Sequence, residues 1–410
     1  MILSQLARSI AESPTLALNE DARRLREKGA PVINMSIGEP RNKTPISAIL
    51  SSAAKLSSGE VKYSPPDGEL SLKKAIIRYT EENYNRIVSP KNIIVSAGAK
   101  QSLFNILFSI LNPQDEVIIL APYWVSYPEI VKMVYGIPII VTPEDGSFHP
   151  SIDDVLSAVS PYTKAIIINS PNNPSGAVYS SDFIAGIVEY CEHKKIYVIL
   201  DDIYHKLVYD ETKWEPAYSF THNDIESTMI ITVNGVAKLY GMTGFRIGWV
   251  VGNSNLVEVM TNVQAQTTSC TSVLQQAAAE GALTGTQGVV ENLRITFQNN
   301  RNVIYQELNS INSIKTIKPQ GTFYILPDFR AYCPSSLAQN SMDLSRFLLE
   351  KALVVTVPGR EFGMEGYVRF SFAGSVKDII EGISRIKWAI DPSSPTEIYI
   401  GDRKIVRDWL

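Results

Sequence analysis

The chain has 410 residues, of which 45% are hydrophobic and 20% are charged, so it can bury a large core and form more than one domain. Its 38 basic and 42 acidic side chains leave a net charge of −4 without strong segregation, which argues against nucleic acid or an anionic membrane surface as a partner. Its apolar runs fall far short of the ~20 residues that a membrane-spanning helix needs. Residues 1–8 lack the basic and apolar regions of a secretory signal, so we expect a cytoplasmic protein.

Three cysteines and four histidines are scattered along the sequence. Cys191, Cys270 and Cys333 are odd in number and widely spaced, which favours reduced thiols over a disulfide framework. The histidines do not cluster, so neither a metal site nor a histidine-centred catalytic triad is expected.

The N-terminal segment is predicted to contain a helix and a short strand. Apolar residues at helical spacing predict an amphipathic helix over residues 15–28, ended by Gly29. The apolar run 32–37 predicts a strand that leads into Gly38. A glycine at that point permits a tight turn or the close approach of a ligand, and the turn is the more common role.

From about residue 63 the sequence alternates turns, helices and strands. Small residues at Gly98 and Ala99, followed by Lys100, connect a predicted strand to a helix, and such a turn exposes N–H groups at a positive helix end that suit a phosphate. Many strand-to-helix turns of this kind bind nothing. The predicted strands of this region are 93–96, 116–120, 139–141, 165–168, 196–200, 229–233 and 247–251. The predicted helices are 70–84, 101–111, 152–159, 182–193, 271–283 and 290–308.

Two loops that follow predicted strands carry candidate ligand-binding side chains, an indole in one and an amide in the other. Trp124 offers a surface for stacking on an aromatic ligand, although filling a core is the more common role of tryptophan. Asn173 lies between prolines in the run 169–176, so it cannot be helical and its amide is held at the carboxyl end of a strand, where open α/β sheets bind ligands.

An acidic residue, Asp201, ends the buried strand 196–200. A buried carboxylate needs a partner, and the N–H of a pyridinium ring is a suitable one. A helix N-cap is the competing role of an aspartate after a strand, and Asp202 fits that role better.

Lys238 and Arg246 lie between two buried apolar runs, 229–233 and 247–251. Desolvation favours the neutral amine of such a lysine, which can then attack a carbonyl carbon. Arg246 offers a planar fork for a phosphate. Taken alone, an ordinary lysine and arginine beside strands would explain both residues.

The C-terminal part is rich in strands. Arg369 alternates with apolar residues in a predicted strand, so its charge needs either an internal salt bridge or a ligand carboxylate. The polar run 264–269 suggests a helix break, and no function is readable in the tail 392–410. The remaining predicted strands are 314–317, 321–326, 354–357 and 367–372, with helices over 342–353 and 377–389.

In their order and their amino-acid sequences, these motifs resemble those of class I aminotransferases of fold type I over most of residues 14–390. The resemblance is strongest to the prokaryotic-type aspartate aminotransferases. The lysine segment 232–249 and the octapeptide 169–176 carry most of the resemblance. The runs 38–40, 121–128 and 358–363 add to it.

The resemblance implies pyridoxal 5′-phosphate as the cofactor and a role for each matching residue. The implied catalytic residues are Lys238, which forms the Schiff base, Asp201 at the ring nitrogen, and Tyr204 at the ring oxygen. The implied cofactor-binding residues are these three with Gly98, Ala99, Lys100, Trp124, Asn173, Arg246 and Tyr63. The implied substrate-binding residues are Gly38, Trp124, Asn173 and Arg369. Because the matching tyrosine of the family reaches the cofactor of the other subunit, Tyr63 implies a homodimer with shared active sites.

The implied fold is α/β, with a large cofactor-binding domain over 46–285 that contains a mostly parallel sheet flanked by helices. A smaller α+β domain combines the N-terminal arm and first segment, 1–45, with residues 286–410. The implied function is transfer of an amino group between an aspartate-like amino acid and a 2-oxo acid such as 2-oxoglutarate. An aromatic or broad-specificity aminotransferase, a lyase or synthase of the same fold, and a non-catalytic effector-sensing module are the alternatives.

Two departures from the family pattern bear on the site. Many relatives have hydroxyl side chains where this chain has Gly235 and Ala237, which leaves Ser96 as a substitute donor to the phosphate. The family usually has an acidic residue after the motif 38–40, whereas Arg41 and Lys43 follow it here. These two cations and Thr15 are candidate partners for a second substrate carboxylate.

Overall fold

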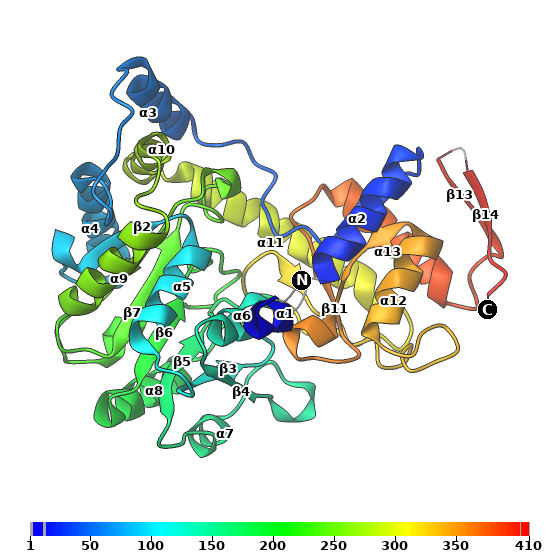
Figure 1. Cartoon of the computed structure of the whole chain (residues 1–410). Helices are drawn as coiled ribbons and strands as arrows, with labels where there is room; N and C mark the ends of the chain where they lie inside the picture. The colour runs from blue at the N-terminus through cyan, green and yellow to red at the C-terminus, as the bar shows by residue number, and fades with distance from the viewer. Residues whose placement is uncertain (1–2, 11–13, 402, 410) are drawn as a thin grey trace.

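The computed structural model describes residues 3–10, 14–401 and 403–409, without the side chains of residues 14–17 and 145. A seven-stranded sheet with the order β2-β8-β7-β6-β5-β3-β4 forms the centre of the larger part of the molecule, on the left of Figure 1. β8 runs antiparallel to both of its neighbours and all other pairs are parallel. The strands are β2 (Ile93–Ser96), β3 (Glu116–Leu120), β4 (Ile137–Val141), β5 (Thr163–Ile168), β6 (Tyr197–Asp201), β7 (Ile230–Gly235) and β8 (Gly248–Val251).

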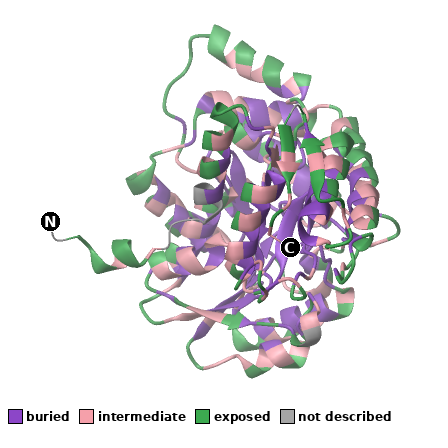
Figure 2. Cartoon of the chain, turned by 90° about the vertical axis from the view of Figure 1, so that its right-hand side faces the viewer, coloured by how far each residue is buried: buried purple, intermediate pink, exposed green. Residues whose placement is uncertain are grey.

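Helices cover both faces of this sheet, which explains why its inner strands are continuous apolar runs rather than alternating ones. Ile118 of β3 packs with one set of helices, while its neighbours Val117 and Ile119 point to the opposite face. One face is covered by α5 (Ala99–Ile110), α6 (Ser126–Met133) and α9 (Ser254–Thr267). The other is covered chiefly by α4 (Leu70–Tyr84) and α8 (Ser181–Lys194). Figure 2 shows the buried residues gathered along the strands.

Further helices complete the larger part and lead out of it. The long helix α11 runs from it towards the smaller part (Figure 1). These helices are α1 (Gln5–Ser9), α3 (Ile46–Ser57), α7 (Ile152–Ser157), α10 (Val273–Thr284) and α11 (Gly288–Asn309). The short 3₁₀ helices are η1 (Pro90–Asn92), η2 (Glu144–Gly146), η3 (Ala217–Phe220), η4 (Thr243–Phe245) and η6 (Gly359–Phe362).

The smaller part, on the right of Figure 1, contains two short sheets besides the hairpin of the C-terminal tail. β1 (Ile33–Asn34) pairs in parallel with β10 (Val354–Val355). β12 (Val368–Ser371) lies between β11 (Val357–Pro358) and β9 (Tyr324–Ile325) and is antiparallel to both. The helices of this part are α2 (Pro14–Glu27), α12 (Ser341–Phe347), the π-helix η5 (Leu348–Ala352) and α13 (Val376–Ile390).

The C-terminal tail forms a hairpin, β13 (Glu397–Ile400) with β14 (Arg403–Val406), and docks on α13. The Trp409 ring lies 5.3 Å from the Trp388 ring, and its Nε1 donates to the Ala389 carbonyl at 3.0 Å. Arg407 donates to carbonyls near the end of α13, including that of Trp388 at 2.9 Å. The tail therefore closes over the last turn of this helix.

The predicted elements are confirmed over most of the chain, with several differences. The strand predicted over 314–317 is only an isolated bridge between Lys315 and Asp328. The N-cap prediction for Asp202 is wrong, because the chain from Asp202 to Pro216, all of it described, folds into turns and a bridge without a helix. The polar run 264–269 contains the end of α9 at Thr267, and residues 268–272 separate this helix from α10.

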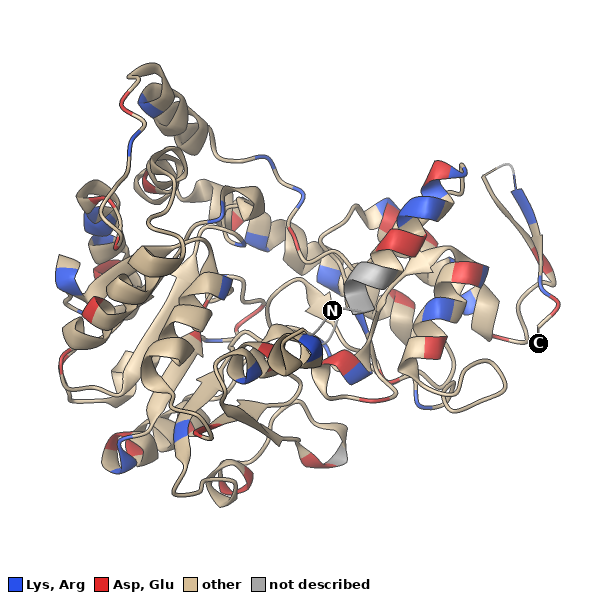
Figure 3. Cartoon of the chain, viewed as in Figure 1, with Lys and Arg blue, Asp and Glu red and all other residues tan. Residues whose placement is uncertain are grey.

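Two observations agree with the expectations from composition. Lys and Arg are mixed with Asp and Glu over both parts of the molecule (Figure 3). No helix in the described part of the chain is long and apolar enough to cross a membrane.

Candidate active site

The loops that carry the predicted site residues leave the same edge of the central sheet. Asn173 and Lys238 follow the carboxyl ends of β5 and β7, and Asp201 is the last residue of β6; these three strands are parallel, so the residues share one edge of the sheet. β2 and β3 end at this edge too, since β2 is antiparallel to β8 and β8 to β7. Ligands of open α/β sheets bind at this edge.

Lys238 is partly buried, and its Nζ donates to the Gly38 carbonyl. The pKa of its ammonium is lowered to about 8, first by burial and then by the nearby charges of Arg369 and Arg246. The carboxylates of Glu39 and Asp201 act in the opposite direction. Residues from four distant segments therefore surround one amine.

Asp201 is 5% exposed and forms no salt bridge with any described cation, although the charge of Lys238 acts on it. The Tyr127 hydroxyl donates to Oδ2 at 2.6 Å, while Oδ1 is buried without a hydrogen-bond partner in the described structure. Burial raises the pKa of this carboxyl to about 6, although the bond from Tyr127 opposes the shift. An unpaired buried oxygen is costly, so Oδ1 is suited to an N–H donor of a ligand.

Nothing in the sequence singled out Tyr127 as a partner of Asp201. Its only signal is its place three residues after Trp124: Trp124 lies in the loop before α6 and Tyr127 in the first turn of that helix, and their ring centres are 5.4 Å apart.

The start of α5 forms a cradle with Arg246. Gly98 has φ 85°, and a Cβ on it would lie 2.5 Å from Nη2 of Arg246, so only glycine fits there. The first N–H groups of α5, at Ala99 and Lys100, have no partner within the helix. The Lys100 ammonium lies 4.9 Å from the Trp124 ring centre. Its pKa is lowered by burial and then by Arg246.

No ion pair with a carboxylate is found for Lys100 or Arg246 within the described ranges, although Arg246 Nη1 donates to the Thr243 carbonyl at 2.8 Å. Two neighbouring cations at a positive helix end, without counter-charge, are suited to a phosphate.

The missing hydroxyl at Gly235 has a steric explanation. Gly235 of β7 pairs with Gly248 of β8, and a Cβ on Gly235 would lie 2.8 Å from the Ile247 carbonyl oxygen. A serine therefore has no room there. Ser96, the proposed substitute donor, is fully buried, and its Oγ accepts from Asn105 at 3.5 Å within the core.

Arg369 is 6% exposed and forms no salt bridge with any described carboxylate, so the internal salt bridge that would have explained it is excluded within that part of the chain. Its Nη1 donates to Asn173 Oδ1 at 2.9 Å and its Nη2 to the Ser36 carbonyl at 2.8 Å. Its Nε has no partner in the described structure. A buried guanidinium without a counter-ion is suited to a carboxylate from a ligand.

Aromatic rings complete the surroundings of Arg369. The guanidinium carbon lies 4.5 Å from the Tyr324 ring centre and 5.0 Å from that of Phe362. The Tyr324 and Tyr204 hydroxyl oxygens are 3.4 Å apart, and burial raises the pKa of Tyr204 well above its ordinary value, so the phenol stays protonated. A Cβ on Gly38 would lie 3.0 Å from the Tyr324 hydroxyl. Tyr324 had no signal beyond being an aromatic residue in a predicted strand.

Three residues named from the sequence lie outside this group. Tyr63 is 90% exposed in the loop between α3 and α4. Arg41 pairs with Asp378 at 3.0 Å on the surface, and Lys43 is exposed. The side chain of Thr15 lies outside the described residues.

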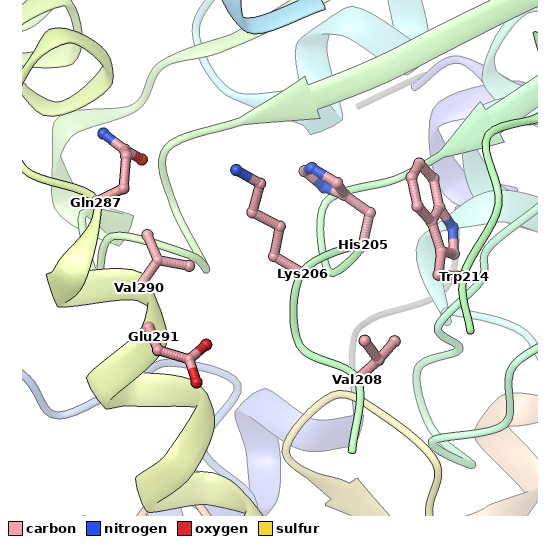
Figure 4. A pocket seen from close by; sticks show the side chains of 7 residues that line it. All are labelled: His205, Lys206, Val208, Trp214, Gln287, Val290 and Glu291. Atoms are coloured by element: carbon pink, nitrogen blue, oxygen red, sulfur yellow. The ribbon is translucent and has the colours of Figure 1, made fainter. Parts of the chain in front are cut away.

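A separate cleft of about 380 Å³ lies between α11 and the segment after Tyr204 (Figure 4). None of the predicted site residues lines it. The polar ends of Gln287 and Glu291 in this cleft are already bonded to Tyr240 and Arg294. The lining residues are His205, Lys206, Val208, Trp214, Gln287, Val290 and Glu291.

The sheet, the cradle and the buried lysine define a pyridoxal-phosphate transferase of fold type I, and the residues present fit that cofactor. The unpaired Asp201 Oδ1 suits its ring nitrogen, and the start of α5 with Arg246 suits its phosphate.

Comparison with known proteins gives the family. The model of the aminotransferase class I and II family matches residues 30–386. The chain is 38% identical to the probable aspartate/prephenate aminotransferase of Aquifex aeolicus, with 92% of this chain and 96% of that one covered. It is 35% identical to the aspartate aminotransferase of Bacillus subtilis, with 96% of this chain and all of that one covered. The chain belongs to the class I and II aminotransferases and is a transaminase that uses pyridoxal phosphate.

Solved structures agree with this assignment. The aspartate aminotransferase of Rhizobium meliloti superposes with a TM-score of 0.89 at 33% identity, over 94% of this chain and 98% of that one. The Thermus thermophilus enzyme with maleate superposes with a TM-score of 0.88 at 33% identity, over 94% of this chain and 99% of that one.

Proposed function

We propose that Lys238, Asp201 and Tyr204 carry out the transamination chemistry in this chain. The observation that carries the proposal is the place of Lys238 after β7, at the edge of the sheet where Asp201 ends β6, with burial and then the charge of Arg369 lowering the pKa of its amine. Perturbed lysines with such neighbours are typical of catalytic sites.

When bound, pyridoxal phosphate supplies a carbonyl for the amino group and an electron sink for the substrate Cα. Lys238 Nζ, with a pKa of about 8, is neutral often enough near pH 8 to accept the Cα proton and return it. The Asp201 carboxylate would hold a proton at the ring nitrogen through Oδ1. The protonated Tyr204 hydroxyl and the Asn173 amide would donate hydrogen bonds to the ring oxygen.

The remaining residues would hold the two substrates and the phosphate. Arg369 would bind the α-carboxylate through Nε and a remaining guanidinium N–H, with its plane set by Asn173 and Ser36. Trp124 would lie on the ring and Gly38 beside the substrate. Gly98, Ala99, Lys100 and Arg246 would bind the phosphate.

We further propose aspartate, or a similar amino acid, as amino donor and 2-oxoglutarate as acceptor, on the strength of the named relatives. Arg41 and Lys43 were candidate partners for a second carboxylate of the substrate. Their positions do not support that role, because Arg41 is paired with Asp378 and Lys43 is exposed.

A panel of amino donors against 2-oxoglutarate tests this substrate assignment. We expect aspartate to have the highest kcat/KM, and the ratio of aspartate to phenylalanine turnover to be unchanged in Arg41→Ala and Lys43→Ala. A charge-assisted bond to substrate would be worth about ten- to a hundredfold, so a drop of that size in either variant would restore the loop mechanism.

The same panel separates the alternatives. A wild-type preference for aromatic donors contradicts the aspartate assignment. Product formed without consumption of the 2-oxo acid would indicate a lyase rather than a transaminase.

A homodimer with shared sites is also proposed. α3, which projects at the top of Figure 1, and the loop after it expose several large apolar residues that a second copy would cover. These are Ile46, Ile49, Leu50, Leu56, Val61 and Tyr63. The domain boundaries at 45/46 and 285/286 and cytoplasmic residence stay predictions.

Tyr63→Phe is expected to weaken cofactor binding about tenfold or more, because one hydrogen bond to a charged phosphate is lost across the dimer. Titration of the cofactor-free enzyme by absorbance measures it. A hybrid of Tyr63→Phe and Lys238→Ala chains contains one site with both native residues and should recover one tight site. A monomer in light scattering, or a hybrid without a tight site, would contradict the shared-site arrangement.

A further inference from the structure

The orientation of Arg369 depends on two acceptors of different origin. Asn173 belongs to the loop after β5, which the central sheet holds. Ser36 contributes its main-chain carbonyl, from the segment that follows β1 in the smaller part. Whatever fixes Ser36 therefore also fixes one side of the guanidinium.

Ser36 is held by a partly buried polar group that we call the Asn19 cluster, consisting of Asn19, Asn34 and Ser36. The Ser36 N–H donates to Asn34 Oδ1 at 2.9 Å. The Ser36 hydroxyl lies 2.8 Å from Asn34 Oδ1 and 3.1 Å from Asn19 Oδ1. Asn34 Nδ2 donates to Asn19 Oδ1 at 2.8 Å.

Asn19 supports one orientation of the Asn34 amide. An amide has a donor end and an acceptor end. The Ser36 N–H only donates, so it requires the Oδ1 end of Asn34, and Asn19 Oδ1 accepts from Nδ2 at the other end. Without the Asn19 acceptor, the Asn34 amide is held within the cluster at its Oδ1 end alone.

The helix that carries Asn19 is itself firmly packed. Leu18 and Ala22 of α2 are buried in an apolar cluster of the smaller part. Asn19 therefore lies on a helix that is held in place by the buried side chains beside it. The other buried members of that apolar cluster are Ala30, Val32, Leu349, Leu353, Val355 and Ile400.

We propose that Asn19 is a positioning residue for substrate carboxylate binding, acting on Arg369 through Asn34 and the Ser36 carbonyl. The inference rests on the proposed function, in which Arg369 binds the α-carboxylate. Loss of the Asn19 acceptor makes the Ser36 carbonyl more mobile, so the Arg369 guanidinium is less ordered before substrate binds. Part of the free energy of carboxylate binding is then used to order this guanidinium. The effect falls on carboxylate affinity rather than on proton transfer at Lys238.

The test uses the holoenzyme with Asn19→Ala, Asn19→Asp and the control Asp21→Ala. Asp21 lies on the same helix with a side chain that is 53% exposed. Aspartate at position 19 keeps an oxygen that accepts from Asn34 Nδ2 and Ser36 Oγ. Maleate, a dicarboxylate that cannot be transaminated, is titrated by calorimetry, and kcat and KM are measured with the best amino donor.

In Asn19→Ala we expect the Kd for maleate and the KM for the amino donor to rise about tenfold, while kcat stays within about twofold of wild type. This pattern is typical of losing an interaction that is equally strong in the ground state and the transition state. In Asn19→Asp both the Kd and the KM should stay within about threefold of the wild-type values. In the control Asp21→Ala both should equal the wild-type values. Unchanged Kd and KM in Asn19→Ala, or an equal loss in Asn19→Asp, would overturn the inference. Wild-type binding of maleate without turnover of any amino donor would instead contradict the proposed function.

Discussion

Lys238→Ala is expected to lose at least about 10⁴-fold in kcat and to form no borohydride-stable adduct with pyridoxal phosphate. The amine is the only group with a lowered pKa that also lies near Asp201 and Arg369 among the described residues, so its loss removes the base that moves the Cα proton. Mass spectrometry of the reduced, digested protein locates the adduct. In wild type, adduct formation by the cofactor-free enzyme should accelerate as pH rises through about 8, because the neutral amine reacts.

Lys206→Ala is the matched control. Burial also lowers the pKa of Lys206, but its ammonium lies 5.0 Å from the Tyr79 ring centre in the separate cleft. The control should keep both the adduct and the activity. An adduct that survives in Lys238→Ala at another lysine would refute the assignment.

Asp201→Asn is expected to bind the cofactor and to lose about 10³-fold in kcat, the size of effect of removing one preorganised electrostatic partner. Asparagine keeps the shape and an acceptor for the Tyr127 hydroxyl, but it carries no charge to hold the ring nitrogen protonated. Absorbance titration measures cofactor binding, and single-turnover kinetics measure the chemical step.

Tyr127→Phe provides the comparison for Asp201. It removes the bond to Oδ2 and leaves the carboxylate in place, so a much smaller loss of rate is expected than for Asp201→Asn. If Asp201→Asn retains kcat within about tenfold of wild type, or if Tyr127→Phe is the more damaging change, the carboxylate does not have the role proposed for it.

The sequence by itself determined the sheet and the loops that carry the chemistry. Continuous apolar runs separated by helical patterns predict parallel strands covered on both faces, and parallel strands place their carboxyl ends at one edge. Asn173, Asp201 and Lys238 were therefore expected near one another before any contact was known. Local regularity of this kind depends on residues a few positions apart, so it is readable in the sequence.

The tertiary structure alone decided which of these groups are paired and which are left open. Arg41, one of the candidate partners for a second substrate carboxylate, pairs with Asp378, 337 residues away, whereas Arg369 is buried without a carboxylate. Tyr127 takes one oxygen of Asp201 and leaves the other unbonded. Such pairings join segments far apart in the chain, and because their free energy depends on packing and burial rather than on local spacing, no pattern in the sequence encodes them.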